Sequence, residues 1–177
     1  MLINYKVSRE IITPLKEYEK LLKKWNKVIN LVSRKSLEDC WNRHILDSLQ
    51  LINFIKDKDI ELVDLGSGAG LPGIILSIAG VKHVTLIEPN KNKCAFLHEA
   101  SKISKNSITI IQKKVENIDI TCDILVARAF SSIEKILKSG VHVRHKYLLL
   151  RGVSYDNKLS DAKIYQSITG NGKIVEL

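Results

Sequence analysis

The spacing of hydrophobic positions in residues 1–57 predicts helices. From residue 5 to residue 29, apolar side chains recur mostly three or four positions apart, which is typical of an amphipathic helix. These positions are Val7, Ile11, Leu15, Tyr18, Leu21, Leu22, Trp25 and Ile29. Pro14 lies inside the pattern, where a proline removes one backbone hydrogen bond. After a connection over residues 30–35, Ser36 and Asp39 resemble a capping pair for a second helix. The apolar face of that helix consists of Leu37, Trp41, Ile45, Leu49 and Ile52.

From Ile60 onward, short apolar runs alternate with helical patterns. Strands are expected at residues 61–65, 83–87, 107–112, 123–127 and 147–150, and helices at 72–79, 91–104 and 131–139. This alternation predicts an α/β fold with a doubly wound, mostly parallel sheet, whose ligand site lies at the carboxyl ends of the strands. Two further strand candidates, 164–168 and 174–177, flank a Gly-Asn-Gly turn. The expected organisation is an N-terminal helical extension over residues 1–57, packed on a core domain over residues 58–177.

The composition narrows the class of protein. The 177 residues include 45% hydrophobic and 27% charged residues, which excludes a disordered or fibrous chain. No apolar run approaches the roughly 20 residues that span a bilayer, and the N-terminus has no apolar signal segment. The three scattered cysteines form no CxxC pair, so neither a zinc site nor a disulfide framework is expected. A reducing cytoplasm fits best.

The charge indicates the kind of partner. Lys and Arg total 28 against 19 Asp and Glu, which leaves a net charge of +9. Such an excess favours a polyanion, either nucleic acid or an anionic membrane, over a neutral metabolite. The alternative is a basic surface that is simply solvated.

A glycine-rich turn is the clearest motif. Residues 63–73 read VDLGSGAGLPG, after a predicted strand and before a predicted helix. A dinucleotide-binding GxGxxG fits only as Gly68-x-Gly70-x-x-Gly73, which starts three residues past the strand. The GxGxG turn of S-adenosylmethionine (AdoMet) sites, preceded by an acidic residue, fits directly as Asp64, Gly66, Gly68 and Gly70. The turn therefore favours AdoMet, with NAD as an alternative.

Two further positions belong to the predicted nucleoside site. Glu88 closes the second strand, 24 residues after Asp64, where a carboxylate can accept both ribose hydroxyls. This role serves NAD and AdoMet alike. The third strand runs toward Val115 and Glu116, where an adenine ring is expected.

The residues after the fourth strand exclude some methyl acceptors. They read Ala127-Arg128-Ala129-Phe130, without the (Asp/Asn/Ser)-Pro-Pro-aromatic motif of enzymes that methylate exocyclic amines of bases. Methylation at carbon 5 of pyrimidines needs a cysteine nucleophile, and Cys122 lies at the amino end of this strand. A ring nitrogen with a free lone pair, such as guanine N7, needs positioning rather than a strong base. Arg128 is a candidate to orient the cofactor or the acceptor, or to bind phosphate.

Taken together, these residues resemble the ribosomal RNA small subunit methyltransferase G family. The resemblance rests on residues 24–31 (KWNKVINL), 43–48 (RHILDS), 64–73 with their LPG ending, 128–130 (RAF) and 150–152 (LRG). It implies a Rossmann-like methyltransferase fold and methyl transfer from AdoMet to N7 of a guanine in 16S rRNA. The implied cofactor contacts are Gly66, Leu71, Val115, Glu116 and Arg128. Asn30, His44, Asp47 and Arg128 would line the mouth between the helical extension and the sheet.

The resemblance also leaves alternatives open. The closing strands of the family extend further, so the final antiparallel strand is expected to be missing here. The protein is expected to be a monomer without a metal or a membrane segment, acting on 16S rRNA or the small ribosomal subunit. Candidate phosphate contacts are Lys23, Lys24, Lys27, Arg34 and Arg43. The alternatives are a methyltransferase for another RNA or a protein, a non-catalytic RNA-binding assembly factor that keeps the cofactor pocket, and an NAD dehydrogenase.

Overall fold

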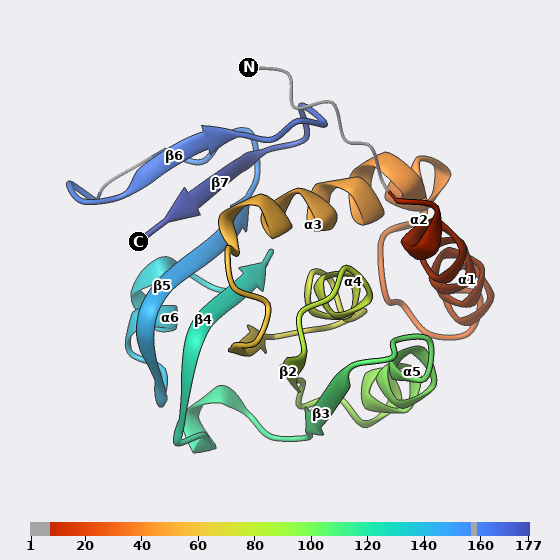
Figure 1. Ribbon diagram of the computed structural model, residues 1–177, viewed down its shortest axis with the longest axis horizontal. Coiled ribbons are helices and arrows are strands. Elements are labelled where there is room, and N and C mark those ends of the chain that lie inside the picture. Colours follow the sequence, from red (N-terminus) through yellow and green to blue (C-terminus); the bar gives the residue numbers. More distant parts are fainter. Residues whose placement is uncertain (1–7, 157–158) are drawn as a thin grey trace.

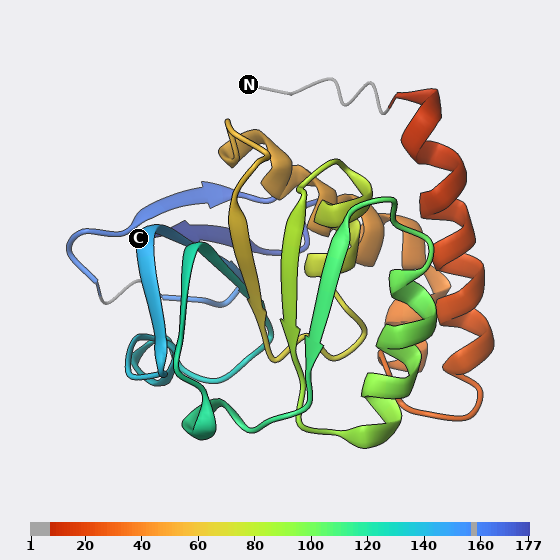
Figure 2. The same cartoon turned by 60° about the horizontal axis from the view of Figure 1, so that its bottom comes forward.

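A computed structural model describes residues 8–156 and 159–177, and its centre is a seven-stranded sheet (Figures 1 and 2). The strands are β1 (Glu61–Leu65), β2 (His83–Ile87), β3 (Ser107–Ile111), β4 (Ile120–Arg128), β5 (Val141–Arg151), β6 (Lys163–Gln166) and β7 (Lys173–Glu176). Their spatial order is β3-β2-β1-β4-β5-β7-β6. The first five strands run parallel, whereas β7 is antiparallel to both β5 and β6. The predicted α/β fold with a mostly parallel sheet is confirmed.

Helices cover the two faces of the sheet unequally. The helices are α1 (Arg9–Trp25), α2 (Arg34–Glu38), α3 (Asp47–Leu49), α4 (Gly73–Ile78), α5 (Lys91–Ser101) and α6 (Ile133–Leu137). Side chains of α1, α3, α4 and α5 share one hydrophobic core with alternate residues of the parallel strands. The other face packs against α6 and the loops around it (Figure 1). Alternation along β1 places Leu62 and Val63 in different cores, because successive strand residues point to opposite faces.

The helical extension is less regular than its hydrophobic pattern predicts. α1 begins at Arg9 and continues through Pro14, while the expected positions 5–7 lie outside the described residues. α2 is capped by Ser33, whose Oγ accepts from the Ser36 amide, so the cap predicted at Ser36 lies three residues too late. The predicted second helix breaks at Asp39, where the backbone leaves the helical region. It resumes as a π-helical turn, η1 (Trp41–Leu46), followed by α3 and a 3₁₀ turn, η2 (Gln50–Phe54).

The extension and the core domain meet in one hydrophobic cluster. Tyr18 of α1 is fully buried, and its hydroxyl donates to the carbonyl oxygen of Ala69 at 2.5 Å. Its ring meets Phe96 edge to face, with centroids 6.2 Å apart, and Trp25 packs on the same ring at 5.8 Å. The glycine-rich turn is thus braced by the extension. The division at residues 57 and 58 stays a prediction, since both segments contribute to this core.

The structure bears on two sequence expectations about the strands. Two antiparallel strands, β6 and β7, close the described part of the sheet, and β7 pairs with β5 from Leu148↔Glu176 to Arg151↔Lys173. The expectation that the family's final antiparallel strand is missing stays a prediction. β4 and β5 are also longer than their apolar runs. Their polar amino-terminal halves pair with each other, from Ile120↔Val141 onward, with an irregularity between Cys122 and Ile124. Backbone pairing extends these strands where side-chain burial gives no signal.

Candidate functional site

The glycine-rich turn after β1 adopts a backbone that side chains rarely allow. Gly66, Gly68 and Gly70 have φ of +72°, +56° and +75°, all in the left-handed region. A Cβ at Gly66 would lie 2.2 Å from Cδ2 of Phe130, so this position admits no side chain without a shift. A Cβ at Gly68 would meet only the Gly66 carbonyl oxygen, at 3.9 Å. The turn therefore presents bare backbone at Gly68, as close approach of a ligand requires.

Asp64 fixes the far end of the turn. Its carboxylate is fully buried, and Oδ2 accepts from the Gly73 amide at 2.9 Å. Oδ1 has no hydrogen-bond partner in the structure. Burial raises the pKa of Asp64 to about 7, and the negative charge of Glu88 adds to the increase while the Gly73 amide opposes it. Asp64 therefore acts as a structural anchor for the turn.

This raised pKa predicts an unusual pH dependence of stability. The folded protein binds a proton at Asp64 more tightly than the unfolded chain, so this group's contribution falls as pH rises from about 4 to about 7. We expect the unfolding temperature of Asp64→Asn to decline less between pH 5 and pH 8 than the unfolding temperature of the wild type declines. Thermal unfolding of both proteins across that range measures the difference. Parallel pH profiles would contradict the raised pKa.

Glu88 braces the turn from the tip of β2. Its Oε2 accepts from the Gly68 amide and its Oε1 from the Asn90 amide, both at 2.9 Å. The residue is 5% exposed. Each carboxylate oxygen has a second lone pair, so the hydroxyls of a ribose can still bind there. Glu88 thus lies against the turn, and its predicted ribose role stays a prediction.

Two cavities meet at Gly66. One, of about 310 Å³, lies between the turn at residues 66–69 and the 31–36 segment of the extension, with His44 and Arg128 in its wall. The other, of about 340 Å³, lies beyond the tips of β2 and β3 and is lined by Val115, Glu116 and Phe130. Gly66 lines both cavities. Six of the predicted cofactor contacts line this pair of cavities, namely Gly66, Gly68, Leu71, Val115, Glu116 and Arg128, whereas the predicted contacts Asp64, Gly70 and Glu88 do not.

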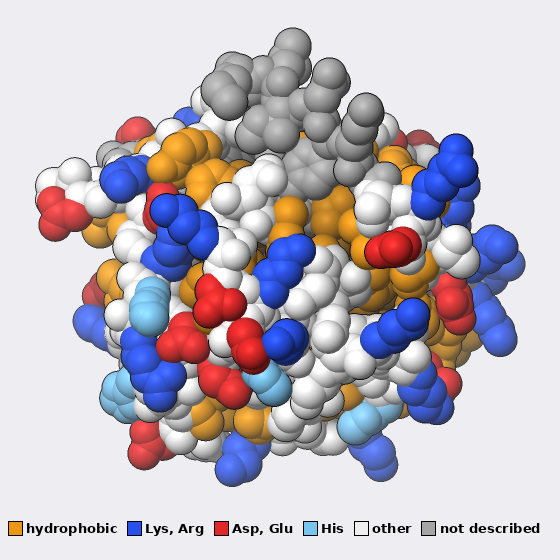
Figure 3. Space-filling model, in the orientation of Figure 1, with side chains coloured by type: hydrophobic (Ala, Val, Ile, Leu, Met, Phe, Trp, Pro, Cys, Tyr) orange, Lys and Arg blue, Asp and Glu red, His pale blue; other side chains and the backbone are white. Residues whose placement is uncertain are grey.

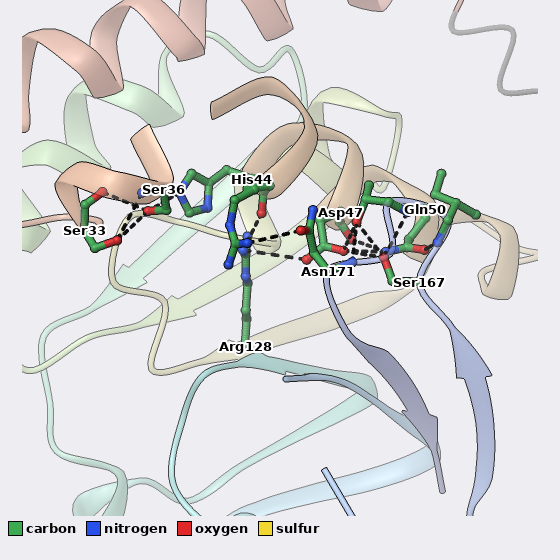
Figure 4. Close-up of polar contacts among 11 residues, drawn as sticks. Ser33, Ser36, His44, Asp47, Gln50, Arg128, Ser167 and Asn171 are labelled. Carbon is green, nitrogen blue, oxygen red and sulfur yellow. Dashed lines mark hydrogen bonds and ion pairs between the residues drawn. The ribbon is translucent and has the colours of Figure 1, made fainter. Parts of the chain in front are cut away.

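Arg128 reaches from the end of β4 to the helical extension (Figure 4). Its Nη2 donates to the carbonyl oxygen of Arg43 and lies 3.6 Å from Oδ2 of Asp47. Its Nη1 is buried and has no hydrogen-bond partner in the structure. Burial lowers the pKa of Arg128, and the charge of Asp47 partly offsets this effect. A cation with a free donor thus stands in the wall of the first cavity.

His44 lies in the same wall as a neutral imidazole. Its Nε2 is 3.0 Å from Oγ of Ser36, and that hydroxyl donates its only proton to the Ser33 carbonyl oxygen at 2.8 Å. We therefore assign the ring proton to Nε2 and a lone pair to Nδ1, which has no partner in the structure. Burial, together with the positive charges of Arg128 and Arg43, lowers the pKa of His44 to about 4. At neutral pH this histidine is a hydrogen-bonding group and a weak base.

Two of the predicted mouth residues lie elsewhere. Asn30 is exposed and does not line the cavity. Asn26, which the sequence analysis does not single out, holds that segment: its Oδ1 accepts from the amides of Leu31 and Val32, both at 2.9 Å. Asp47 is 6% exposed and stands behind Arg128, outside the cavity wall. The roles predicted for Asn30 and Asp47 as mouth residues stay untested predictions.

The three cysteines offer no reactive thiolate at neutral pH. Cys40, Cys94 and Cys122 are all buried and unpaired by disulfides. Burial raises the pKa of Cys40 to about 11 and that of Cys122 to about 12, and it also raises the pKa of Cys94. A thiolate nucleophile is therefore not provided at neutral pH. Among the residues described, no group of three or more His, Cys, Asp or Glu is arranged to hold a metal ion.

The excess positive charge is not spread evenly over the surface. On the face shown in Figure 3, a group of acidic side chains lies among Lys and Arg side chains, so this face is mixed in sign. A surface that binds a polyanion must therefore be sought in particular grooves rather than over the whole molecule.

Within the described ranges, no helix is both long and apolar enough to cross a membrane.

Comparisons with known proteins agree with this geometry. Residues 11–173 match the family model described as GidB, rRNA small subunit methyltransferase G. Ribosomal RNA small subunit methyltransferase G of Rickettsia prowazekii is 52% identical over 97% of this chain and 96% of that protein. The protein of the same name from Rickettsia massiliae is 53% identical over 97% of this chain and 94% of its own length.

Solved structures show the same fold at low sequence identity. Magnesium protoporphyrin IX methyltransferase from Synechocystis, solved with bound SAM, is 12% identical with a TM-score of 0.60, covering 98% of each chain. A putative S-adenosyl-L-methionine-dependent methyltransferase from Methanococcus maripaludis is 13% identical with a TM-score of 0.61, covering 99% of this chain and 96% of its own. The fold, the glycine turn and the family match leave no support for the dehydrogenase alternative. The chain belongs to the rRNA small subunit methyltransferase G family.

Proposed function

We propose that this protein transfers a methyl group from AdoMet to N7 of a guanine in 16S rRNA. AdoMet supplies an electrophilic methyl group on a positively charged sulfur. The proposal rests on family membership for the substrate class and on the composition of the first cavity for the position on the base. A monomer acting in the cytoplasm on 16S rRNA or the small ribosomal subunit is the form that we expect.

One observation carries the choice of N7: among the residues that the structure describes, none in the wall of the first cavity carries a carboxylate or a thiol. Its ionisable groups are His44, Lys93 and Arg128. An exocyclic amine must lose a proton after methylation, and no group in this wall is a good base, since the pKa of His44 is about 4. N7 carries a lone pair and no proton. Its attack breaks the carbon–sulfur bond, and the positive charge passes from sulfur to the guanine ring, so no proton needs to move.

Residues of this chain are then needed for positioning rather than for proton transfer. Arg128 offers a donor at Nη1, which suits the carboxylate of the AdoMet tail, a base carbonyl or a phosphate. His44 offers an acceptor at Nδ1. A phosphate oxygen cannot donate to that lone pair, whereas the N1–H and the amino group of guanine can. His44 therefore suits the base better than the backbone of the RNA.

The test is methyl transfer with tritiated AdoMet to deproteinised 16S rRNA, to the small subunit and to ribosomal proteins. We expect label in the RNA of at least one of the first two substrates and none in protein. Label only in protein would overturn the proposal in favour of the protein methyltransferase alternative. Binding of AdoMet and RNA without transfer to any substrate would favour the assembly-factor alternative.

The structure sorts the predicted phosphate contacts into separate groups. Lys23, Lys27 and Arg34 line one groove between α1 and α2, of about 570 Å³. Lys24 lines a different groove, between α1 and α5. Arg43 donates to Asn171 at 3.1 Å. The groove between α1 and α2 adjoins the 31–36 segment, which forms one wall of the first cavity. This groove is therefore our candidate site for RNA phosphates.

RNA affinity should fall steeply with salt, because each phosphate contact releases counterions. We expect Lys27→Ala and Arg34→Ala each to reduce the slope of log affinity against log salt by about 1. Lys24→Ala, three residues before Lys27 but in the other groove, is the matched control and should leave the slope unchanged. Filter binding of 16S rRNA from 50 to 300 mM salt measures the slopes. Equal slopes for all four proteins would contradict the assignment of this groove.

A further inference from the structure

The turn between β6 and β7 contacts the side chains of the two residues that hold Arg128. Figure 4 shows Arg128 rising from β4 toward the extension, with Ser167 and Asn171 approaching from the turn. The guanidinium is held by the Arg43 carbonyl oxygen and by Oδ2 of Asp47, 3.6 Å from Nη2. Both holding residues belong to the extension. Both are in turn contacted by residues 167–171, although these lie more than 115 residues later in the chain.

Asp47 is oriented mainly by the turn. Its Oδ1 accepts from Oγ of Ser167 at 2.6 Å and from Oγ1 of Thr169 at 3.0 Å. Gln50, on the next helical turn, donates to the same oxygen at 2.9 Å. Three donors on Oδ1 fix the rotation of the carboxylate and leave Oδ2 directed toward Arg128. Asp47 and Ser167 are each 6% exposed and Gln50 is 1% exposed, whereas Thr169 is half-buried at the edge of the cluster.

A second contact of the turn reaches the side chain of Arg43, the other residue that holds Arg128. Asn171 Oδ1 accepts from Nη1 of Arg43, 3.1 Å away, and the carbonyl oxygen of Arg43 accepts from Arg128. The same turn therefore reaches Arg128 by two separate routes. Neither route places a side chain of the turn in the cavity wall. The side chains of the turn therefore lie outside this cavity and reach it only through Arg128.

We propose that the β6–β7 turn positions Arg128 for methyl transfer, with Ser167 and Thr169 as positioning residues and Asp47 as the link. This inference rests on the proposed function, because it assigns Arg128 a part in that reaction. Charged hydrogen bonds in a dry site fix geometry tightly, and residues that orient a functional group through one intermediate commonly change rates by 10- to 100-fold. The turn would thus belong to the reaction machinery although it lies outside the cavity.

The test compares two substitutions of Thr169. Thr169→Val removes the hydroxyl while keeping the shape, and we expect single-turnover methyl transfer to RNA at saturating AdoMet to slow about tenfold. Thr169→Ser restores the hydroxyl and should recover most of the rate. Ile168→Ala, which trims a neighbouring side chain that is 40% exposed, is the control for general disturbance of the turn. A rate for Thr169→Val equal to that of the wild type would overturn the proposal.

A double-mutant cycle separates positioning from a merely structural role. If Thr169 acts through Arg128, then Thr169→Val should cause no further loss of rate in an Arg128→Ala background. Equal losses in both backgrounds would overturn the proposal. Ser167→Ala provides a second cycle should Thr169→Val fail to fold. The rate is total methyl incorporation into RNA, whatever nucleoside carries it, so an error in the N7 assignment leaves this test intact. No incorporation by the wild type would instead refute the proposed function.

Discussion

Replacing Gly66 by Asp is expected to weaken AdoMet binding by about 100-fold or more. The left-handed backbone at Gly66 strains any residue with a Cβ, and that Cβ would lie 2.2 Å from the ring of Phe130. Gly66 also lines both cavities, so an inserted carboxylate would disturb both ends of the cofactor site. Isothermal titration calorimetry with AdoMet measures the loss.

The control separates strain from site geometry. Gly80 also has a positive φ, of +111°, but lies between α4 and β2, where a Cβ would meet only the side chain of Lys58. Gly80→Asp should therefore cost stability while AdoMet affinity stays near that of the wild type. Should Gly66→Asp fail to fold, Gly68→Ala tests the same cavity, since a Cβ there meets no close neighbour. A folded Gly66→Asp protein that binds AdoMet as the wild type does would contradict the site.

Replacing Arg128 by Ala is expected to slow methyl transfer by about 100- to 1,000-fold, the usual cost of losing one preorganised electrostatic contact. The substitution also leaves the buried carboxylate of Asp47 without its cation, which should destabilise the fold by about 3 kcal/mol. Single-turnover transfer to RNA and thermal unfolding measure the two effects. A rate within threefold of the wild type would contradict the role of Arg128.

A compensating variant tests the physical origin of that instability. Arg128→Ala combined with Asp47→Asn removes both charges, so the double variant should regain stability relative to Arg128→Ala alone. Its methyl transfer should stay slow, because the cation in the cavity wall is still absent. A double variant that is no more stable than Arg128→Ala would show that the unpaired carboxylate is not the cause.

The core of the fold could be predicted because its signals are local. The central strands β1 and β2 are largely buried on both faces, so they appear as short apolar runs, and the glycine turn at Gly66 is set by neighbouring residues. The edge strand β3 is only partly buried but is also an apolar run. The polar halves of β4 and β5 gave no such signal, because they are strands only through pairing with each other. The cap at Ser33 and the break at Asp39 likewise depend on backbone geometry that hydrophobic spacing does not encode.

The site was predictable in part for the same reason. Asp64, Glu88 and Arg128 lie at or beside the carboxyl ends of β1, β2 and β4, and these ends meet at one edge of the sheet. Gln50 lies three residues after Asp47, so helical spacing could have paired them. Ser167 and Thr169 gave no signal, since they meet Asp47 only after the whole sheet has formed. The predicted mouth residue Asn30 lies in a segment that is held by hydrogen bonds to the side chain of Asn26.

The central claim is that the methyl group goes to N7 of guanine in 16S rRNA. The most direct measurement is mass spectrometry of the nucleosides from 16S rRNA after reaction with deuteromethyl-labelled AdoMet. The account predicts label in 7-methylguanosine and in no other nucleoside, with about 100-fold less label after reaction with Arg128→Ala over the same initial period. Label in a nucleoside methylated on an exocyclic amine, on carbon 5 of a pyrimidine or on a ribose would contradict it.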